Sequence, residues 1–256
     1  MTRDIVVMGT SAGGVEALQR VVAGFPPDLR AAVFVVMHVT AEGTSALPAI
    51  LRRAGPLPAH HAINGESISY GRIYVAPPDY HLLLRDGVVR VVHGPRENRC
   101  RPAVDPLFRS AAIAYGERVI GVVLSGALDD GTAGLHSVTE RQGLAIVQDP
   151  EDALVPAMPR SAMGYANIDH IASADRIGTL IGELTREHVT DRVPPPSHRM
   201  VDEADIAVLE PGMMEDDDNT KASRRPSPVR SLSPSSAPSP WIPCTYQCVS
   251  DPSGRR

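Results

Sequence analysis

Apolar residues along the chain fall into two alternating patterns. One is a short, continuous run of strand length, which recurs at residues 5–8, 31–37, 119–124 and 143–148. The other is a stripe of helical period, which recurs at about residues 15–22, 45–53, 104–113, 135–138, 159–165 and 176–186. Continuous apolar strands are typical of a parallel sheet buried on both faces, because crossover helices cover both sides. The pattern therefore predicts an α/β fold with a doubly wound, mostly parallel sheet and helices on both faces.

In residues 59–92 the apolar runs are shorter and turn signals separate them. Turn signals at Asn64-Gly65 and at Asp86-Gly87 separate short runs of strand-forming residues. We expect Arg72–Ala76, Leu82–Leu84 and Val88–Val92 to form a small antiparallel hairpin excursion from the main sheet.

The composition changes again after about residue 190. A triple proline at 194–196, an acidic run at 215–218 and a Ser/Pro-rich stretch at 223–240 offer little apolar area to offset the entropy of ordering. We therefore predict one domain over residues 1–189 and a mostly disordered tail over residues 190–256. Cys244 and Cys248 have the spacing of half a zinc site, but no second ligand pair follows, so two thiols in a disordered tail is the favoured interpretation.

Composition and charge disfavour several functional classes. Hydrophobic residues make up 43% of the 256 residues but aromatic ones only 4%, so Val, Ile, Leu and Ala must fill the core. A net charge of -5 gives no electrostatic reason to expect nucleic acid or an anionic membrane as partner. No apolar run approaches the roughly 18 residues of a membrane-spanning helix, and the N-terminus lacks the apolar region of a signal peptide. A cytoplasmic protein without membrane insertion is the simplest interpretation.

The segment Gly9-Thr-Ser-Ala-Gly13 follows the first apolar run and precedes the first helical stripe. It fits G-x-S-x-G, the turn that presents a serine nucleophile at a strand end, near helix N–H groups that favour negative charge. A phosphate-binding loop uses the same setting, but Gly9, Gly13 and Gly14 do not give a G-x-G-x-x-G spacing and no lysine follows. A turn of small residues that only lets strand and helix pack closely is the third interpretation.

Two further polar positions stand at strand ends. His38 follows the second apolar run directly, and the pair Asp129 and Asp130 follows the third. Each alone is more often structural, since an aspartate before glycine commonly caps a helix. Together with Ser11 they supply a nucleophile, a base and a carboxylate that orients the base, at the sheet edge where α/β folds bind ligands. We therefore predict a serine-hydrolase site that uses no cofactor and no metal.

The order of these residues along the chain is Ser, His, Asp. Enzymes of the α/β-hydrolase fold have the order Ser, Asp, His, and their nucleophile lies well inside the chain rather than at residue 11. The site is therefore not that of an ordinary esterase of that fold. A dinucleotide site is also disfavoured, because His38 stands where an acidic residue would bind the ribose.

Five segments resemble the catalytic domain of the chemotaxis protein-glutamate methylesterases, the CheB family. They are Gly9-Thr-Ser-Ala-Gly-Gly-Val-Glu-Ala-Leu18, Phe34-Val-Val-Met-His38, Tyr74-Val-Ala-Pro-Pro-Asp-Tyr-His-Leu82, Arg101-Pro-Ala-Val-Asp-Pro-Leu-Phe-Arg-Ser-Ala-Ala112 and Leu124-Ser-Gly-Ala-Leu-Asp-Asp-Gly-Thr-Ala-Gly-Leu135. They occur in the family's order, within a resemblance that runs from about residue 3 to residue 187. The resemblance implies hydrolysis of γ-glutamyl methyl esters on the cytoplasmic domain of methyl-accepting chemoreceptors, and deamidation of certain receptor glutamines.

The resemblance also assigns roles to single residues. Carried onto this chain, Ser11 is the nucleophile, His38 the base and Asp130 the third member, whereas Asp129 has no catalytic counterpart in the family's motif. His81 matches a family histidine near the site.

Three backbone N–H groups are candidates for an oxyanion site. They belong to Thr10, Ala12 and Ala127, of which Ala12 follows from the elbow geometry and Ala127 from the resemblance.

The sequence departs from the family pattern in three places. Met37 stands where a glutamine usually precedes the histidine, and Ala127-Leu128 stands where the family usually carries Met-Gly. An alanine backbone still donates a hydrogen bond, so we expect the chemistry to survive with a changed pocket shape. The well-known members also carry an N-terminal receiver domain. With the nucleophile at residue 11, we expect none to precede it, which leaves control to a separate receiver or another chemosensory protein.

Two other functions stay open from the sequence. One is a hydrolase of the same fold that acts on a different ester or amide. The other is a non-catalytic scaffold in a signalling array, with the proline-rich and acidic tail as its interaction element. The simultaneous presence of Ser11, His38 and Asp130 disfavours the scaffold.

Overall fold

The computed structural model describes residues 1–41, 45–85, 87–189 and 193–209. Its strands are β1 (Ile5–Thr10), β2 (Ala32–Met37), β3 (Ala59–His61), β4 (Arg72–Val75), β5 (His81–Arg85), β6 (Val88–Val92), β7 (Val119–Val123), β8 (Leu144–Gln148) and β9 (His170–Ala172). Its helices are α1 (Gly14–Ala23), α2 (Leu47–Ala54), α3 (Val104–Tyr115), the 3₁₀ turn η1 (Gly116–Arg118), α4 (Thr132–Glu140), α5 (Ala157–Tyr165), α6 (Ala174–Leu184) and α7 (His198–Ile206).

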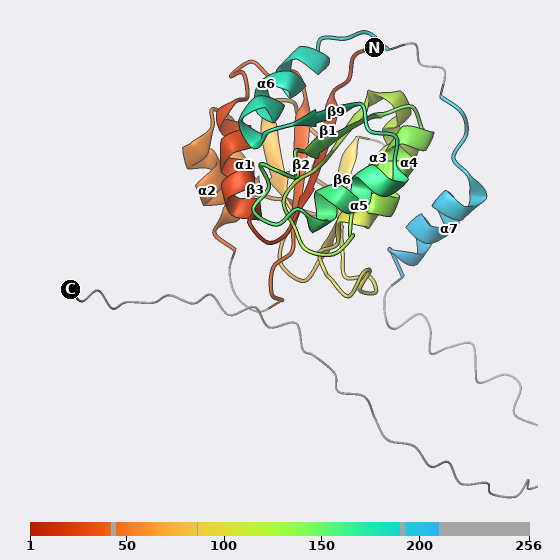
Figure 1. Ribbon diagram of the computed structural model, residues 1–256. Coiled ribbons are helices and arrows are strands. Elements are labelled where there is room, and N and C mark those ends of the chain that lie inside the picture. The colour runs from red at the N-terminus through yellow and green to blue at the C-terminus, as the bar shows by residue number, and fades with distance from the viewer. Residues whose placement is uncertain (42–44, 86, 190–192, 210–256) are drawn as a thin grey trace, which may run out of the picture. The chain divides into compact units, whose positions relative to one another are not determined.

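A seven-stranded sheet with the order β3-β4-β2-β1-β7-β8-β9 forms the centre of the fold (Figure 1). Every neighbouring pair in it is parallel, as the continuous apolar runs predicted. From β1 the chain builds the sheet outward through β2 first, and then returns to the other side of β1 with β7. The boundary between β1 and β7 is therefore the point where the strand order reverses, at which open α/β sheets bind their ligands beyond the carboxyl ends of the strands.

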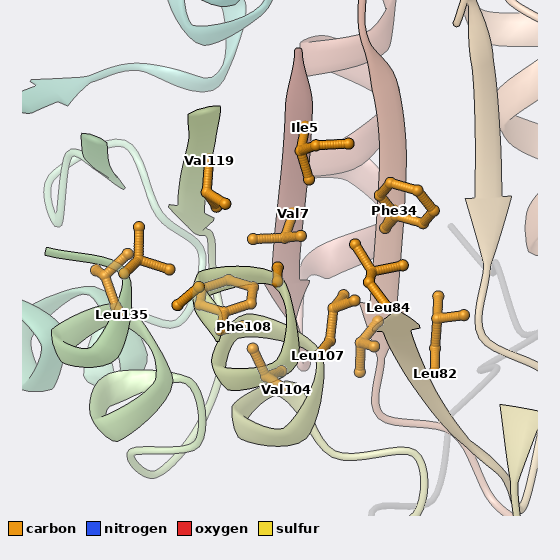
Figure 2. Packing of buried hydrophobic residues seen from close by; sticks show 14 of the residues in the cluster. Ile5, Val7, Phe34, Leu82, Leu84, Val104, Leu107, Phe108, Val119 and Leu135 are labelled. Carbon is orange, nitrogen blue, oxygen red and sulfur yellow. The ribbon is translucent and has the colours of Figure 1, made fainter. Parts of the chain in front are cut away.

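Helices cover both faces of this sheet. The apolar sides of α1, α2 and α6 pack in one buried cluster on one face. On the other face, α3, α4, α5 and the hairpin of β5 and β6 share a second cluster. Figure 2 shows Leu107 of α3 beside Leu84 of β5, and Phe108 on the other side, toward Leu135 of α4. This packing fixes the N-terminus of α3 beneath the carboxyl ends of the central strands.

The expected hairpin excursion is smaller than the sequence suggested. Only β5 and β6 pair antiparallel, in a two-stranded sheet of their own. The assignment of Arg72–Ala76 to the excursion is wrong, because β4 pairs parallel with β2 and belongs to the main sheet. Its residues Ile73, Tyr74 and Val75 are buried, which is the environment of an inner strand.

The ordered part of the chain extends beyond the predicted boundary at residue 189. Helix α7 lies within the segment for which a mostly disordered tail was expected, and its Met200 is buried in the core beside α3. The side chain of Ser197 caps this helix by accepting a hydrogen bond from the Met200 N–H. Residues 210–256, including Cys244 and Cys248, lie outside the described residues.

Neither a membrane span nor a metal cluster is found in the described part of the chain. No helix there is long and apolar enough to cross a bilayer. Nor do three or more His, Cys, Asp or Glu side chains gather there in a way that could hold a metal ion.

Candidate active site

Ser11 lies directly after β1, in a turn that only small residues allow. Gly13 adopts a φ of 75° before α1, in the left-handed region that glycine enters without strain. At Gly9 a Cβ atom would lie 2.2 Å from the Cγ1 atom of Val104, so α3 can approach β1 only because this residue is glycine. The glycines therefore serve close packing as well as the turn. Ser11 itself is half-buried at the carboxyl edge of the sheet.

Ser125 ties this turn to the loop that follows β7. Its hydroxyl donates to the carbonyl of Ala12 at 2.8 Å and accepts from the Val155 N–H at 2.9 Å. The next residue, Gly126, lies so close to Ser11 that a Cβ atom there would be 3.0 Å from the Cβ of the serine. The two loops that carry oxyanion candidates are thus held side by side. No local pattern in the sequence pointed to this role of Ser125.

The three oxyanion candidates differ in accessibility. In the described ranges, the N–H groups of Ala12 and Ala127 have no hydrogen-bond partner, and the residues are exposed and half-buried respectively. Thr10 is fully buried, pairs with Met37 in the sheet, and donates its hydroxyl to the Ser125 carbonyl at 2.6 Å. Ala12 and Ala127 therefore offer donors to a ligand, while Thr10 holds the strands together.

His38 and Asp130 meet as the strand-end argument predicted. His38 follows β2, the parallel neighbour of β1, and Asp130 follows β7 on the other side. The Nε2 atom of His38 lies 2.6 Å from Oδ2 of Asp130. The aspartate is buried, with 2% of its side chain exposed, and the histidine is 17% exposed. A buried carboxylate so paired can hold the imidazole in one orientation.

Four donors surround the carboxylate of Asp130. Its Oδ2 accepts from His38 and, at 2.7 Å, from the backbone N–H of Val104. Its Oδ1 accepts from the side-chain amide of Asn98 at 2.8 Å and from the Asp105 N–H at 3.2 Å. Burial alone would raise the pKa of Asp130, but the hydrogen bond and charge of His38 and these other donors hold it below its usual value. The carboxylate is thus kept ionised at the N-terminus of α3, where the helix favours negative charge.

Asn98 is a site residue that sequence reasoning missed. It lies in a tight turn in which Glu97 and Cys100 exchange backbone hydrogen bonds, and its φ is 51°. Its amide also donates to Oδ2 of Asp105 at 2.7 Å, so it bridges two carboxylates. Burial, followed by the nearby charge of Asp130, raises the pKa of Asp105. Asparagine tolerates positive φ, which is the one local signal that could have pointed to this turn.

Ser11 and His38 stand on neighbouring strand ends without a bond between their side chains. Within the described residues, the hydroxyl of Ser11 makes no hydrogen bond to His38, and the imidazole is instead hydrogen-bonded to Asp130. Burial opposes the charge on the ring, but hydrogen bonding and charge at Asp130, followed by those of Cys100, outweigh it and raise the pKa of His38 to about 10. In this arrangement the imidazolium form is favoured.

His81 lies behind the site rather than on its surface. The residue is fully buried, its Nε2 lies 2.8 Å from the carbonyl oxygen of Pro95, and its Nδ1 accepts from the Ala103 N–H at 3.2 Å. Burial lowers the pKa of this histidine, in keeping with a neutral ring that donates at one nitrogen and accepts at the other. His81 therefore supports the residues that precede α3 and does not reach a ligand.

Leu128 carries backbone strain beside the candidate oxyanion group of Ala127. Its φ is 65°, which costs a non-glycine residue about 1–2 kcal/mol, and the residue is 62% exposed. We expect Leu128→Gly to raise the free energy of unfolding by about 0.5–1 kcal/mol, because relief of strain exceeds the extra flexibility of glycine in the unfolded chain. Thermal unfolding measures this, and Leu128→Ala, which keeps the strain, should change little. Equal stabilisation by both variants would contradict the strain argument.

The fold and the strand-end side chains define an α/β domain with a candidate serine-hydrolase site. Residues 6–181 match the sequence profile described as CheB methylesterase. The chain belongs to this family, as the five sequence segments predicted.

Individual relatives agree with this assignment. A Leptospira interrogans protein is 35% identical over 193 residues, which cover 75% of this chain and all of that protein. An Anaeromyxobacter dehalogenans protein named protein-glutamate methylesterase/protein-glutamine glutaminase 2 is 37% identical over 183 residues, 72% of this chain and 54% of that protein. The crystal structure of the Thermotoga maritima CheB methylesterase catalytic domain superposes with a TM-score of 0.67 at 33% identity, and covers 72% of this chain and 100% of that one.

Proposed function

We propose that this chain hydrolyses γ-glutamyl methyl esters on the cytoplasmic domain of methyl-accepting chemoreceptors, and that it deamidates receptor glutamines at the same site. The observation that carries the proposal is the hydrogen-bonded pair of half-buried His38 and buried Asp130, which follow the two strands that flank β1. Membership of the CheB methylesterase family supplies the substrate class. The name of the Anaeromyxobacter relative combines the two activities.

In the first half of the reaction, His38 takes the proton of the Ser11 hydroxyl while the serine oxygen attacks the ester carbonyl. The N–H groups of Ala12 and Ala127 are the donors available to the developing oxyanion. Collapse of the tetrahedral intermediate breaks the bond to the methoxy oxygen, which leaves as methanol with the proton from His38. Asp130 stabilises the imidazolium that forms between these two transfers.

In the second half, His38 removes a proton from water, which attacks the glutamyl ester of Ser11. The histidine then returns the proton to the serine oxygen, and glutamate is released. A glutamine substrate follows the same route with ammonia as the first leaving group. Catalysis requires the imidazole to form a hydrogen bond with the Ser11 hydroxyl, in addition to the one with Asp130. Such catalytic hydrogen bonds commonly tighten only in the substrate complex.

Methanol release from a methylated receptor fragment tests the proposal. We expect the chain to liberate methanol with matching loss of glutamyl methyl ester, and to cleave a panel of small esters far less efficiently. A higher kcat/KM for some small ester, with no methanol from the receptor, would point to a hydrolase of the same fold with another substrate. Failure of a serine-directed phosphonate to label Ser11 would point to a scaffold.

The pH dependence of kcat/KM should report the unusual state of His38. The base must be neutral to accept the serine proton, and its hydrogen bonds raise its pKa to about 10. We therefore expect the rate to climb with pH until about pH 10, instead of levelling near the ordinary histidine value of about 6.5. Initial rates with a small ester, corrected for spontaneous hydrolysis, measure this profile.

The raised pKa of His38 also makes the stability of the fold depend on pH. Because the folded pKa of His38 is raised, its stabilising effect is complete below about pH 6.5 and is lost as the pH rises through about 10.

Replacement of Cys100 by alanine removes one of the interactions that raise the pKa of His38. We expect Cys100→Ala to move the rise in kcat/KM to lower pH. A profile that levels near pH 6.5 in the unaltered protein, as for an unperturbed histidine, would contradict the assignment.

A further inference from the structure

Helix α7 lies beyond residues 6–181, the part of the chain that matches the family, yet it packs against the loop of residues 94–102, here called the 94–102 loop. Met200 anchors the helix in the core, where the residue is 3% exposed. At Gly94 a Cβ atom would lie 2.0 Å from the carbonyl oxygen of Ala207, so the end of the helix touches the start of the loop directly. The 94–102 loop and α7 therefore share a close-packed contact.

A buried arginine joins the two elements a second time. Arg109 of α3 is 2% exposed, and its Nη2 donates to both carboxylate oxygens of Glu97 at 2.8 and 2.7 Å. Its Nη1 donates to Oε2 of Glu203 on α7 at 3.2 Å. Within the described residues these two carboxylates are the only side-chain partners of the guanidinium. Glu203 thus pairs with Nη1 while Glu97 pairs with Nη2, and without Glu203 the guanidinium would have Glu97 as its single acidic partner among the described residues.

Glu97 is also the first residue of the turn that reaches the candidate active site. Its backbone pairs with that of Cys100, and Asn98 and Arg99 between them both have positive φ, at 51° and 66°. The turn presents Asn98 to Asp130 at 2.8 Å. A continuous connection, made of side-chain hydrogen bonds and the peptide bond between Glu97 and Asn98, therefore runs from α7 to the His38–Asp130 pair.

We propose that Glu203 is a positioning residue for the esterase, and that α7 sets the turnover rate by fixing the turn that carries Asn98. Without Glu203, both Nη groups of Arg109 would depend on Glu97, and re-pairing would shift the turn and loosen the Asn98–Asp130 hydrogen bond. The oxyanion candidates are held by Ser125 instead, so substrate binding should be little affected. This inference rests on the proposed function for its substrate.

Kinetics of one variant in α7 and one in the 94–102 loop, against a matched control, test the proposal. Glu203→Gln removes the charge, and Gly94→Ala displaces the helix end without altering Glu203. We expect each to lower kcat by about threefold to thirtyfold, with KM changed by less than about twofold. Asp202→Asn removes the same charge from an exposed neighbour that has no hydrogen bond or ion pair in the described ranges, and should leave both constants unchanged.

A double-mutant cycle separates positioning from a loss of stability. If Glu203 acts through Asn98, Glu203→Gln should have no further effect on kcat in an Asn98→Ala background. An additive effect, or a kcat within about twofold of the unaltered protein for both Glu203→Gln and Gly94→Ala, would overturn the proposal. The rate at which a phosphonate labels Ser11 gives a parallel measurement that needs no receptor. A chain that is labelled but releases no methanol would contradict the proposed substrate while leaving the role of Glu203 to be decided by the labelling rates.

Discussion

Ser11→Ala is expected to lower kcat for methanol release by about 10⁴-fold or more. Alanine removes the attacking oxygen and leaves the turn itself intact, because the backbone N–H of residue 11 bonds the Ser125 carbonyl at 3.0 Å and its carbonyl accepts from Gly14. The variant should therefore fold normally and still bind a methylated receptor. Initial rates of methanol release, together with phosphonate labelling, measure the loss.

Ser67→Ala is the matched control for this experiment. Ser67 is an exposed serine in the segment before β4, and its hydroxyl makes no hydrogen bond within the described residues. Its replacement should leave kcat unchanged. Undiminished turnover by Ser11→Ala would refute the assignment of the nucleophile.

Asp130→Asn should combine a catalytic loss with a structural one. We expect kcat to fall by about 10⁴-fold, because a neutral amide neither fixes the imidazole nor stabilises the imidazolium. All four neighbours of the carboxylate donate hydrogen bonds, so the NH₂ group of an asparagine would face a donor in either orientation. The resulting unpaired polar groups should lower the free energy of unfolding by about 1–3 kcal/mol. Thermal unfolding and initial rates measure the two effects separately.

Asp129→Asn provides the control with the same change in charge. Asp129 is exposed, and among the described residues only its backbone carbonyl makes a hydrogen bond, which it accepts from the Thr132 N–H. Its replacement should leave kcat and the unfolding midpoint unchanged. Equal losses from both variants would show that the effect is electrostatic and general, rather than a property of the contact between Asp130 and His38.

Local patterns were sufficient to predict the central strands and the polar residues at their carboxyl ends. Continuous apolar runs predicted β1, β2 and β7, since burial on both faces of a parallel sheet requires such runs. Because parallel strands end at one edge, the positions of Ser11, His38 and Asp130 after these runs predicted their common location. A further hypothesis was that the side chains of His38 and Asp130 would be hydrogen-bonded to each other. The distance of 2.6 Å between Nε2 of His38 and Oδ2 of Asp130 agrees with it.

Local patterns were misleading where neighbours in space decide the outcome. Turn signals around β4 are the same for an antiparallel hairpin and for a parallel inner strand, and only pairing with β2 distinguishes them. Helix α7 follows a triple proline and has a polar surface, so its stability depends on burial of Met200 and the contact of Glu203 with Arg109. The cap at Ser197 was the one local signal for it.

By itself the sequence determined the central strands β1, β2 and β7, the common edge at which Ser11, His38 and Asp130 follow them, and the family. Only the tertiary structure decided how the site is held. It showed that Asp130 receives two N–H groups from α3 and one from Asn98, and that, within the described residues, the imidazole of His38 is hydrogen-bonded to Asp130 and not to Ser11. The physical reason is that strand and helix formation follow from local spacing, whereas these hydrogen bonds join residues from different loops and helices that only the packed core brings together.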